Sequence, residues 1–492
     1  MSSTATPIDR ACEEATHSSQ DPLGEMNREI FVRDYLTRTA GSRESKIRNA
    51  DHHVDKSSIV FGGGNWLDEL NYPIVMQRAD GSRLHDIDGN DYVDVLQGLG
   101  ANLFGHNPEF VRSAIAEQLE QGFPIGVQTC LAAEVAKQIT CLTGMDRVCF
   151  SNTGTEAVMT AIRVARAATG RRKIAIFTNS YHGHTDTVLM RAPLAEYARK
   201  GLIRRSQNQR WLSPISRLLE NRLVAGAAPA SIGIPASVAR DVIVLDYGNP
   251  RSLKVIKSKR TKLAAVLVEP VQSRNPELQP REFLHELREI TRSSGTALVF
   301  DEMVTGFRVH PAGAQGHFDV DADLATYSKI VGGGLPLSVI AGRGPWLDRL
   351  QSRAMNSREK TAFFAGTFCK HPLSLAASKA ILSRLIAEGE QFQLTLNERT
   401  ASLVERLNQL AANHSWPVRW THFGSFFSIA VSESQLTPEQ IVHFSHRLLH
   451  AGIHLRRGDR GGFLTSAHSD ADVEKIFQTH ANGLEAVLKG ES

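Results

Sequence analysis

Lys329 is the residue whose setting most clearly suggests covalent chemistry. It follows the strand-like residues 326–328 and precedes Ile330–Pro336, a run that contains three consecutive glycines. A lysine beside glycines can approach a bulky planar group without obstruction from neighbouring side chains. When such a lysine is partly desolvated or lies near other cations, its pKa falls and it becomes a nucleophile toward carbonyl groups. A single lysine is more often an ordinary surface charge, so the interpretation depends on its partners.

An acidic residue and a hydroxyl-rich turn supply two such partners. Asp301 directly follows the apolar run 296–300, and a carboxylate in that place can keep a ring nitrogen protonated. A helix cap is the alternative. Thr153, Gly154 and Thr155 open an amphipathic stretch, so their amides and hydroxyls are suited to bind a phosphate at the positive end of a helix dipole. Taken alone, this turn fits a plain N-cap better.

Tyr181 and His182 come shortly after another strand-like run, residues 173–177. Tyr181 is placed to stack on a planar ring, although a buried tyrosine with a satisfied hydroxyl is the alternative. In chain order, the sequence therefore offers a phosphate cup, a stacking aromatic ring, a carboxylate for a ring nitrogen and a Schiff-base lysine. Together these features predict a pyridoxal 5′-phosphate (PLP) site.

The elements that must position these residues alternate between helix and strand from residue 110 to 345. Amphipathic periodicity predicts helices over 109–121, 130–142, 154–168 and 281–294. Continuous apolar runs predict strands that are buried on both faces of a mostly parallel sheet, over 174–177, 242–245, 264–268 and 297–300. We expect the acids that end three of these runs to meet at the carboxyl edge of the sheet. These acids are Asp246, Glu269, Asp301 and Glu302.

The pattern predicts an α/β fold in four segments. Residues 110–345 form a large PLP-binding domain, and residues 346–492 form a smaller α+β domain. Residues 26–109 comprise a solvated helical arm followed by a small antiparallel sheet with Asp-Gly turns, whose strands are expected over 73–76, 84–87 and 92–95. Residues 1–25 are expected to be a disordered tail.

Composition and charge exclude several classes of protein. The chain has 492 residues, of which 41% are hydrophobic and 22% charged, and its formal net charge is only +4. These values are ordinary for a globular protein and give no reason to expect a nucleic-acid or membrane partner. No apolar run approaches the roughly 20 residues that span a bilayer, and the N-terminus lacks the apolar core of a secretory signal. Five scattered cysteines predict reduced thiols in a cytoplasmic protein and no metal site.

Several of these motifs resemble those of the class III aminotransferases of PLP fold type I, in the branch that contains glutamate-1-semialdehyde aminomutase. The resemblance runs from about residue 60 to the end of the chain. The matching stretches are Asp86–Asp94, Ser151–Ala157, Tyr181–His184, Val268–Val271, Asp301–Arg308, Ser328–Pro336 and Phe364–Phe368.

The resemblance implies a role for each residue at the cofactor. Lys329 would form the Schiff-base link and later move a proton between the substrate and the cofactor. Asp301 would pair with the ring nitrogen and make the ring an electron sink. The phosphate would be held by Thr153–Thr155, and Tyr181 would stack on the ring with His182 nearby.

Three further residues are assigned in the same way. Thr367 would reach the cofactor phosphate of the partner subunit, which implies a homodimer with shared active sites. Glu269 and Trp66 are expected on the substrate side.

A closer likeness within this branch is to the aminotransferase domains of hybrid polyketide/non-ribosomal peptide synthetases, which aminate β-keto acyl chains tethered to a carrier protein. It rests on Asp246–Pro250, Glu269–Arg274, Leu278–Leu284, His310–Gln315 and Gly366–Pro372. The chain has no room for a synthase module. Its partners would therefore be a small-molecule amino donor and either a separate acyl carrier protein or a released carbonyl substrate.

Two regions depart from the family pattern. The aminomutase grips its substrate carboxylate with an arginine near the end of the N-terminal segment, but here no arginine lies between Arg48 and Arg78. Because a bidentate carboxylate partner is missing, binding of a small amino acid such as glutamate semialdehyde should be weaker. The matching residues Phe61–Asp68 are also consistent with a flexible glycine loop. The basic stretch 199–222 is either a docking face for an acidic carrier protein or a solvated helix.

Three functions remain open at this point. The leading interpretation is a PLP-dependent aminotransferase of secondary metabolism that aminates a keto or aldehyde carbon. The second is an intramolecular aminomutase of the glutamate-1-semialdehyde type. The third is a PLP-binding module without catalytic activity, which is disfavoured because Lys329, Asp301 and Tyr181 are intact and no DNA-binding helix-turn-helix precedes the domain.

Overall fold

The computed structural model describes residues 22–54, 66–207, 225–351 and 361–489. A seven-stranded sheet forms its centre, in the order β4-β12-β11-β10-β9-β5-β8. The strands in this order are Arg147–Ser151, Ser338–Gly342, Leu324–Tyr327, Ala297–Asp301, Leu263–Val268, Lys173–Phe177 and Val242–Leu245. β12 runs antiparallel to the six other strands of this sheet, which all run in one direction. The mostly parallel sheet expected from the apolar runs is thus confirmed.

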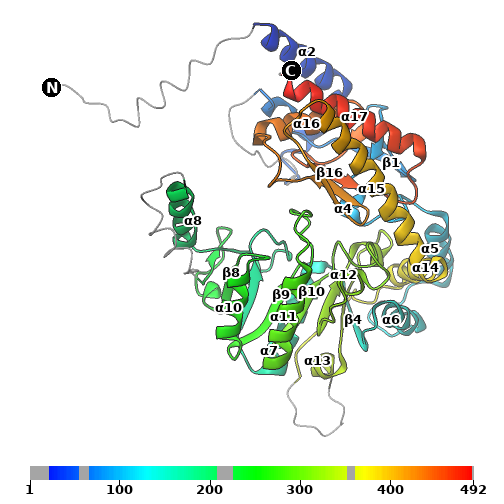
Figure 1. The fold of residues 1–492 in the computed structure, drawn as a ribbon. Coiled ribbons are helices and arrows are strands. Elements are labelled where there is room, and N and C mark those ends of the chain that lie inside the picture. Colours follow the sequence, from blue (N-terminus) through cyan, green and yellow to red (C-terminus); the bar gives the residue numbers. More distant parts are fainter. Residues whose placement is uncertain (1–21, 55–65, 208–224, 352–360, 490–492) are drawn as a thin grey trace.

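Both faces of the sheet are buried, which explains why the strand sequences are continuously apolar. Along β10, Ala297 and Val299 face one hydrophobic cluster together with α7 (Gly154–Thr169). The alternate residues Leu298 and Phe300 face the other cluster, which contains α11 (Arg281–Ser294). In Figure 1 the sheet and the helices α7, α10 and α11 fill the lower half of the view.

The helices predicted around this sheet are present at nearly the expected residues. They are α5 (Glu109–Gln121), α6 (Cys130–Thr143), α7 and α11. Further elements complete this part of the chain: α4 (Gln97–Gly100), β6 (Met190–Arg191), α8 (Leu194–Gln207), β7 (Ala228–Pro229), α10 (Pro250–Lys259), α12 (Gly313–Phe318) and α13 (Gly344–Leu347). Within the described ranges, 3₁₀ turns lie at Asp68–Leu70, Val238–Asp241, Lys329–Gly332 and Asp348–Leu350.

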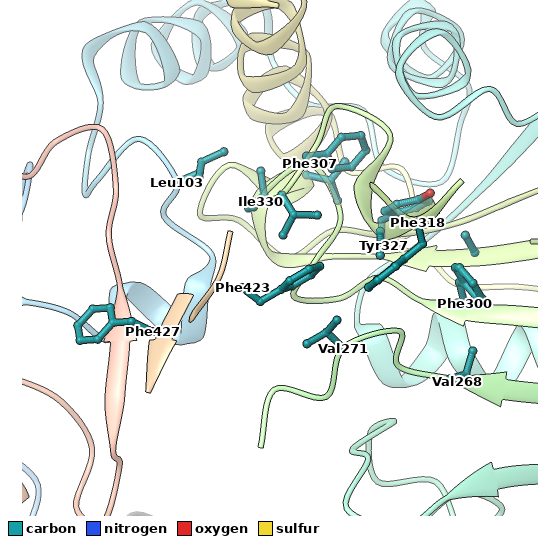
Figure 2. Close-up of a cluster of buried hydrophobic side chains, with 14 of the residues drawn as sticks. Leu103, Val268, Val271, Phe300, Phe307, Phe318, Tyr327, Ile330, Phe423 and Phe427 are labelled. Carbon is teal, nitrogen blue, oxygen red and sulfur yellow. The ribbon is translucent and has the colours of Figure 1, made fainter. Parts of the chain in front are cut away.

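The C-terminal residues form a second layer of structure above the sheet (Figure 1). Its helices are α14 (Pro372–Glu388), α15 (Glu390–Asn413), α16 (Pro438–His450) and α17 (Asp470–Leu488). A small sheet joins β13 (Trp420–Phe423), β14 (Phe426–Ile429) and β16 (Gly461–Phe463). Figure 2 shows Phe423 from this part beside Phe318 of the sheet part, with ring centroids 5.8 Å apart and nearly parallel. The two parts therefore share one hydrophobic core.

The small N-terminal sheet contains one strand that the sequence did not predict. The three antiparallel strands present here are β1 (Met76–Asp80), β2 (Arg83–Asp86) and β3 (Asp91–Asp94). The predicted strand 73–76 shares only Met76 with β1, which runs on to Asp80 and ends at the tight turn at Gly81, where φ is 53°. The fourth strand, β15 (Ile453–His454), pairs in parallel with β3.

The N-terminal arm is not the solvated helix that its charge predicts. It consists of α2 (Pro22–Arg38) and α3 (Ala40–Asn49), so helix already begins inside the expected tail, whose residues 1–21 lie outside the described chain. Phe31 and Tyr35 are buried against Val442 of α16. These two aromatic residues are four positions apart and so share one face of α2, which docks despite the charges around it. No helix among the described residues is long and apolar enough to cross a membrane.

Candidate active site

Three strand ends bring the predicted chemical residues together. Asp301 ends β10, Glu269 follows β9 and Lys329 comes two residues after β11. These three strands are parallel neighbours in the sheet, so their carboxyl ends lie at the same edge, where ligands bind in open α/β sheets.

Asp301 is held by a buried histidine. The Nδ1 atom of His182 lies 2.6 Å from an oxygen of Asp301, and both side chains are about 1% exposed. The other Asp301 oxygen accepts a hydrogen bond from the Met303 amide at 3.2 Å. Among the described residues, the His182 Nε2 atom is buried without a hydrogen-bond partner. Since buried polar groups are normally paired, a bound group at this point would supply the partner that this nitrogen lacks.

Glu269 follows the strand on the far side of Asp301 from Lys329 and is held by two backbone amides. One of its oxygens accepts the Tyr181 amide at 3.3 Å and the other accepts the Ser273 amide at 2.8 Å. Burial, with a further contribution from the charge of Asp301, raises the pKa of Glu269 above its usual range. Glu269 therefore orders the backbone of the loop that carries Tyr181.

Lys329 has the properties that its sequence context predicted. Its backbone is left-handed, with a φ of 54°, which is uncommon for a residue with a side chain. Burial lowers the pKa of its amine to about 8; the charges of Glu269 and Asp301 raise it, while Arg308 and Arg456 lower it. A substantial neutral fraction near neutral pH makes this amine a competent nucleophile toward carbonyl groups.

The phosphate cup lies against the same cluster. Thr153 is the N-cap of α7, and its side chain accepts the Glu156 amide at 3.3 Å. A Cβ atom on Gly154 would lie only 2.8 Å from the Met303 sulfur, and one on Gly183 would collide with the Thr155 hydroxyl. These close approaches pack the start of α7 against the loops that follow Tyr181 and Asp301. Thr153 can therefore cap α7 and also help to bind a phosphate. The cap uses the Thr153 side chain and the Glu156 amide, and it leaves the amides of Gly154 and Thr155 available to a ligand.

The residues present fit PLP. The buried carboxylate of Asp301 suits a protonated ring nitrogen, the helix start at Thr153–Thr155 suits a phosphate, and Lys329 suits the aldehyde. The orphaned Nε2 atom of His182 is the observation that a bound group would explain.

Not every predicted site residue joins this cluster. Trp66 packs against His443, with ring centroids 4.9 Å apart, and against Phe31 of the N-terminal arm. Thr367 is exposed in the turn before α14. Tyr181 reaches the cluster through its backbone amide, but its side chain is not enclosed by it. The residue is 51% exposed, and the guanidinium of Arg274 lies 5.7 Å from its ring centroid.

The expectation that all four strand-end acids meet at one place is wrong. Glu302 accepts hydrogen bonds from the amides of Ala314 and Gln315 at 2.9 and 3.0 Å, so it holds α12. Its side chain points away from that of Asp301 because adjacent residues of a strand alternate between faces. Asp246 pairs with Lys200 at 2.6 Å.

The basic stretch 199–222 is only partly described. Arg199 is buried and pairs with Glu196, donating from Nε at 2.8 Å, and Lys200 is the partner of Asp246. These two residues thus already have internal partners. Trp211 and the residues around it lie outside the described chain, as do Phe61–Asn65.

Sequence reasoning missed one residue beside Lys329. Arg308 is buried, donates 2.7 Å to the Ser425 hydroxyl and lies 4.7 Å from the centroid of the Phe463 ring. Burial lowers the pKa of this guanidinium to about 9. The sequence signal for Arg308 is its position at the end of the stretch Asp301–Arg308, which resembles the family.

The fold and the site together define a PLP-dependent transferase of fold type I, with Lys329 at the carboxyl edge of a mostly parallel sheet. The family model of the class III aminotransferases matches residues 67–461. The chain belongs to that family.

Relatives and solved structures agree with this assignment. The chain is 33% identical to a glutamate-1-semialdehyde 2,1-aminomutase from Desulfitobacterium hafniense over 419 residues, covering 82% of this chain and 89% of that protein. Its fold is similar to that of an omega-transaminase from Sphaerobacter thermophilus, with a TM-score of 0.76 and 24% identity over 92% of this chain and 98% of that chain. It is also similar to a glutamate-1-semialdehyde aminomutase from Pseudomonas aeruginosa, with a TM-score of 0.78 and 20% identity over 95% and 99% of the two chains.

Proposed function

We propose that this protein is an aminotransferase of secondary metabolism, which moves an amino group from an amino-acid donor to a keto or aldehyde carbon. The acceptor is a released carbonyl compound or a β-keto acyl thioester on a separate carrier protein. The observation that carries the proposal is the Lys329 amine, whose pKa is lowered to about 8 at the carboxyl edge of the sheet, beside Asp301 and Glu269.

Each residue of the cluster has one task in this reaction. PLP, when bound, supplies an electron sink that weakens the bonds at the carbon bearing the amino group. Lys329 moves a proton at that carbon, because its amine is neutral in a substantial fraction of molecules. Asp301 holds the ring-nitrogen proton, and His182 orients Asp301 through their 2.6 Å contact. Glu269 orders the Tyr181 loop on the substrate side.

An intramolecular aminomutase is the second candidate, because the relative from Desulfitobacterium carries that name at 33% identity. Its support is weakened by the absence of an arginine between Arg48 and Arg78, where the family comparison expects the grip on the substrate carboxylate. The two candidates share the residues that hold the cofactor and differ in the need for an external donor.

The assembly that supports this activity is a homodimer in the cytoplasm. Thr367 is exposed together with Phe363 and Phe368, whose side chains are 76% and 57% exposed. Two large exposed aromatic rings around a polar residue suit a surface that a second subunit covers. In this arrangement Thr367 would contact the cofactor phosphate held by the partner.

The deciding experiment follows the visible absorbance of the purified holoenzyme while glutamate or glutamine is added without an acceptor. An aminotransferase loses its visible band and releases the matching keto acid. A mutase keeps the band with common donors. A protein with no such band would contradict the assignment of the PLP site.

A further inference from the structure

Arg308 connects three parts of the chain at the carboxyl edge of the sheet. It belongs to the loop that follows β10, and its Nη2 atom donates a hydrogen bond to the backbone oxygen of Gly100, at the end of α4. Its Nη1 atom donates at 2.7 Å to the hydroxyl of Ser425, between β13 and β14. The ring centroid of Phe463 in β16 lies 4.7 Å from the guanidinium. Arg308 therefore ties the large sheet to the segment after the N-terminal sheet and to the C-terminal part.

The same arginine lies next to the turn that carries Lys329. The ring centroid of the preceding residue, Phe307, lies 5.1 Å from that of Tyr327, which is two residues before Lys329. Phe307 and Ile330, the residue after Lys329, belong to one buried hydrophobic cluster (Figure 2). α4, whose last backbone oxygen Arg308 binds, contacts the 3₁₀ turn that begins at Lys329. The neighbours of Arg308 thus pack against the chain on both sides of Lys329.

α4 is a left-handed turn, which is an uncommon conformation for residues with side chains. All four residues of Gln97–Gly100 have positive φ values, from 49° to 85°, and two of them carry side chains. Such a conformation persists only where the surroundings determine it. Arg308 is part of these surroundings, because a Cβ atom on Gly100 would lie 3.2 Å from its guanidinium and 2.8 Å from the Phe463 ring. The hydrogen bond from Arg308 to the Gly100 oxygen therefore helps to hold the turn in place.

The positive charge of Arg308 has no carboxylate beside it in the part of the chain that the structure describes. Its hydrogen bonds go to a hydroxyl and a backbone oxygen, and its Nε atom is buried and has no partner there. A buried charge usually has an acidic partner. Without one, Arg308 disfavours a second positive charge nearby, and its charge is among those that lower the pKa of Lys329. This arrangement favours the neutral amine, which is the form that attacks a carbonyl carbon.

Arg171 makes similar hydrogen bonds at the opposite edge of the same sheet. It donates to three backbone oxygens and to the hydroxyl of Thr296 at 2.8–3.1 Å. One of these oxygens belongs to Leu263, the first residue of β9, and Thr296 directly precedes β10. Arg171 therefore fixes the amino ends of strands whose carboxyl ends lie at the active site. It is a matched control for Arg308, because it also binds backbone oxygens but lies at the edge of the sheet away from Lys329.

We propose that Arg308 is a positioning residue for Lys329. It holds α4 against the turn that begins at Lys329, and its uncompensated positive charge favours the neutral form of the amine. The inference rests on the proposed function, in which this amine reacts with a carbonyl group and moves a proton. Arg308 acts through Lys329 and is assigned no contact with the substrate.

The first test follows the rate of PLP uptake by the apoprotein against pH in Arg308→Gln, Arg308→Lys and the control Arg171→Gln. The neutral amine reacts, so the rate levels off above the pKa of Lys329. Arg308→Gln removes a charge that lowers this pKa, so its profile should move to higher pH and uptake at pH 7 should fall about threefold or more. Arg308→Lys keeps the charge and should keep the profile of the wild type. An unmoved profile in Arg308→Gln, or an equal shift in Arg171→Gln, would overturn the proposal.

The second test measures positioning by amide hydrogen exchange of the full-length holoenzyme. Glutamine and lysine both lack the fork of donors that reaches both acceptors at once, so either Arg308 variant should speed exchange in residues 97–103 and 329–333 about threefold or more. Arg171→Gln should instead speed exchange at the amino ends of β9 and β10. Unchanged exchange in residues 97–103 and 329–333 would overturn the positioning role. Arg308→Lys decides the question where Arg308→Gln does not fold.

Steady-state kinetics separates this inference from the proposed function. Arg308→Gln should lower kcat about tenfold and leave KM for the amino donor within about twofold, since a residue that acts through Lys329 does not bind the donor. A rise in KM with unchanged kcat would make Arg308 a substrate-binding residue and overturn the proposal. A wild-type enzyme that takes no amino group from any donor contradicts the proposed function, whereas the uptake profile and the exchange rates still decide the role of Arg308.

Discussion

Asp94 and Asp301 are buried carboxylates that end strands and are held by histidine, but their surroundings differ. Asp94 ends β3 and contacts His106 at 2.7 Å and His454 at 2.8 Å. It also accepts the amides of Leu96 and Gln97 at 2.9 and 3.0 Å. Burial alone would raise the pKa of Asp94, but the hydrogen bonds from both histidines outweigh it and hold the pKa well below its usual range.

Asp301 ends β10 and contacts one histidine. The polar groups around it include an unpaired nitrogen and two side chains with shifted pKa values. The Nε2 atom of His182 has no partner among the described residues, the pKa of Glu269 is raised and that of Lys329 is lowered to about 8. A carboxylate whose oxygens are all hydrogen-bonded stabilises the fold. A cluster with an unpaired nitrogen and shifted pKa values is suited instead to bind a ligand. The comparison separates a structural carboxylate from a functional one without reference to the sequence motif.

The largest effect is expected at Lys329. Lys329→Ala removes the nucleophile and the proton carrier, so turnover should fall by roughly 10³-fold or more, while the melting temperature is retained or rises because a desolvated amine is lost. Steady-state kinetics and thermal unfolding measure both quantities. Lys379→Ala, at a surface lysine paired with Glu134, is the control, and normal catalysis by the Lys329 variant would refute its assignment.

Asp301→Asn tests the functional side of the comparison. The amide keeps the shape of the side chain but loses the charge that holds a ring nitrogen protonated, so we expect kcat to fall by about 10²-fold or more with little change in stability. Asp246→Asn, at another strand end, should leave kcat nearly unchanged. Equal losses in the two variants would show that strand-end charge in general, rather than Asp301, supports the reaction.

Asp94→Asn tests the structural side. The amide keeps one acceptor oxygen, but its NH2 group cannot accept, so one histidine loses its acceptor and both lose the negative charge. The free energy of unfolding should therefore fall by about 2–4 kcal/mol in urea titrations, with kcat per folded molecule unchanged. Because the folded pKa of Asp94 is depressed, its contribution is present above the unfolded pKa of about 3.9 and is lost as pH falls below it. The exposed Asp91→Asn on the same strand should cost less than about 0.5 kcal/mol.

The smallest effect concerns the charge on Glu269. Its negative charge raises the pKa of Lys329, so Glu269→Gln should shift that pKa below 8. The measurement is the rate of PLP uptake by the apoprotein against pH, since the neutral amine reacts and the rate levels off above its pKa. A shift to higher pH in the variant would contradict the geometry described for Glu269 and Lys329.

Much of the site was accessible from the sequence because its signals are local. The apolar run before Asp301 predicts the strand and therefore the edge where the carboxylate lies. The glycines after Lys329 predict the close approach of a planar group. Both interpretations use only a few neighbouring residues and general strand geometry.

Other features depend on contacts between distant segments and could not be predicted in this way. The charges of α2 predicted a solvated arm, but the packing of Phe31 and Tyr35 depends on Val442. Trp66 lies against His443 for the same reason. The opposite directions of Asp301 and Glu302 were predictable from strand alternation, provided that the strand was known to include Asp301.

The parallel pairing of β15 with β3 has a consequence for synthesis of the chain. His454 and Asp94 are 360 positions apart, so at about 5–20 residues per second a ribosome needs roughly 20 to 70 seconds to deliver the last strand after the first three. During that interval β3 presents an unpaired edge, which is a template for association with other chains. A chaperone can therefore act on the nascent N-terminal sheet throughout that interval.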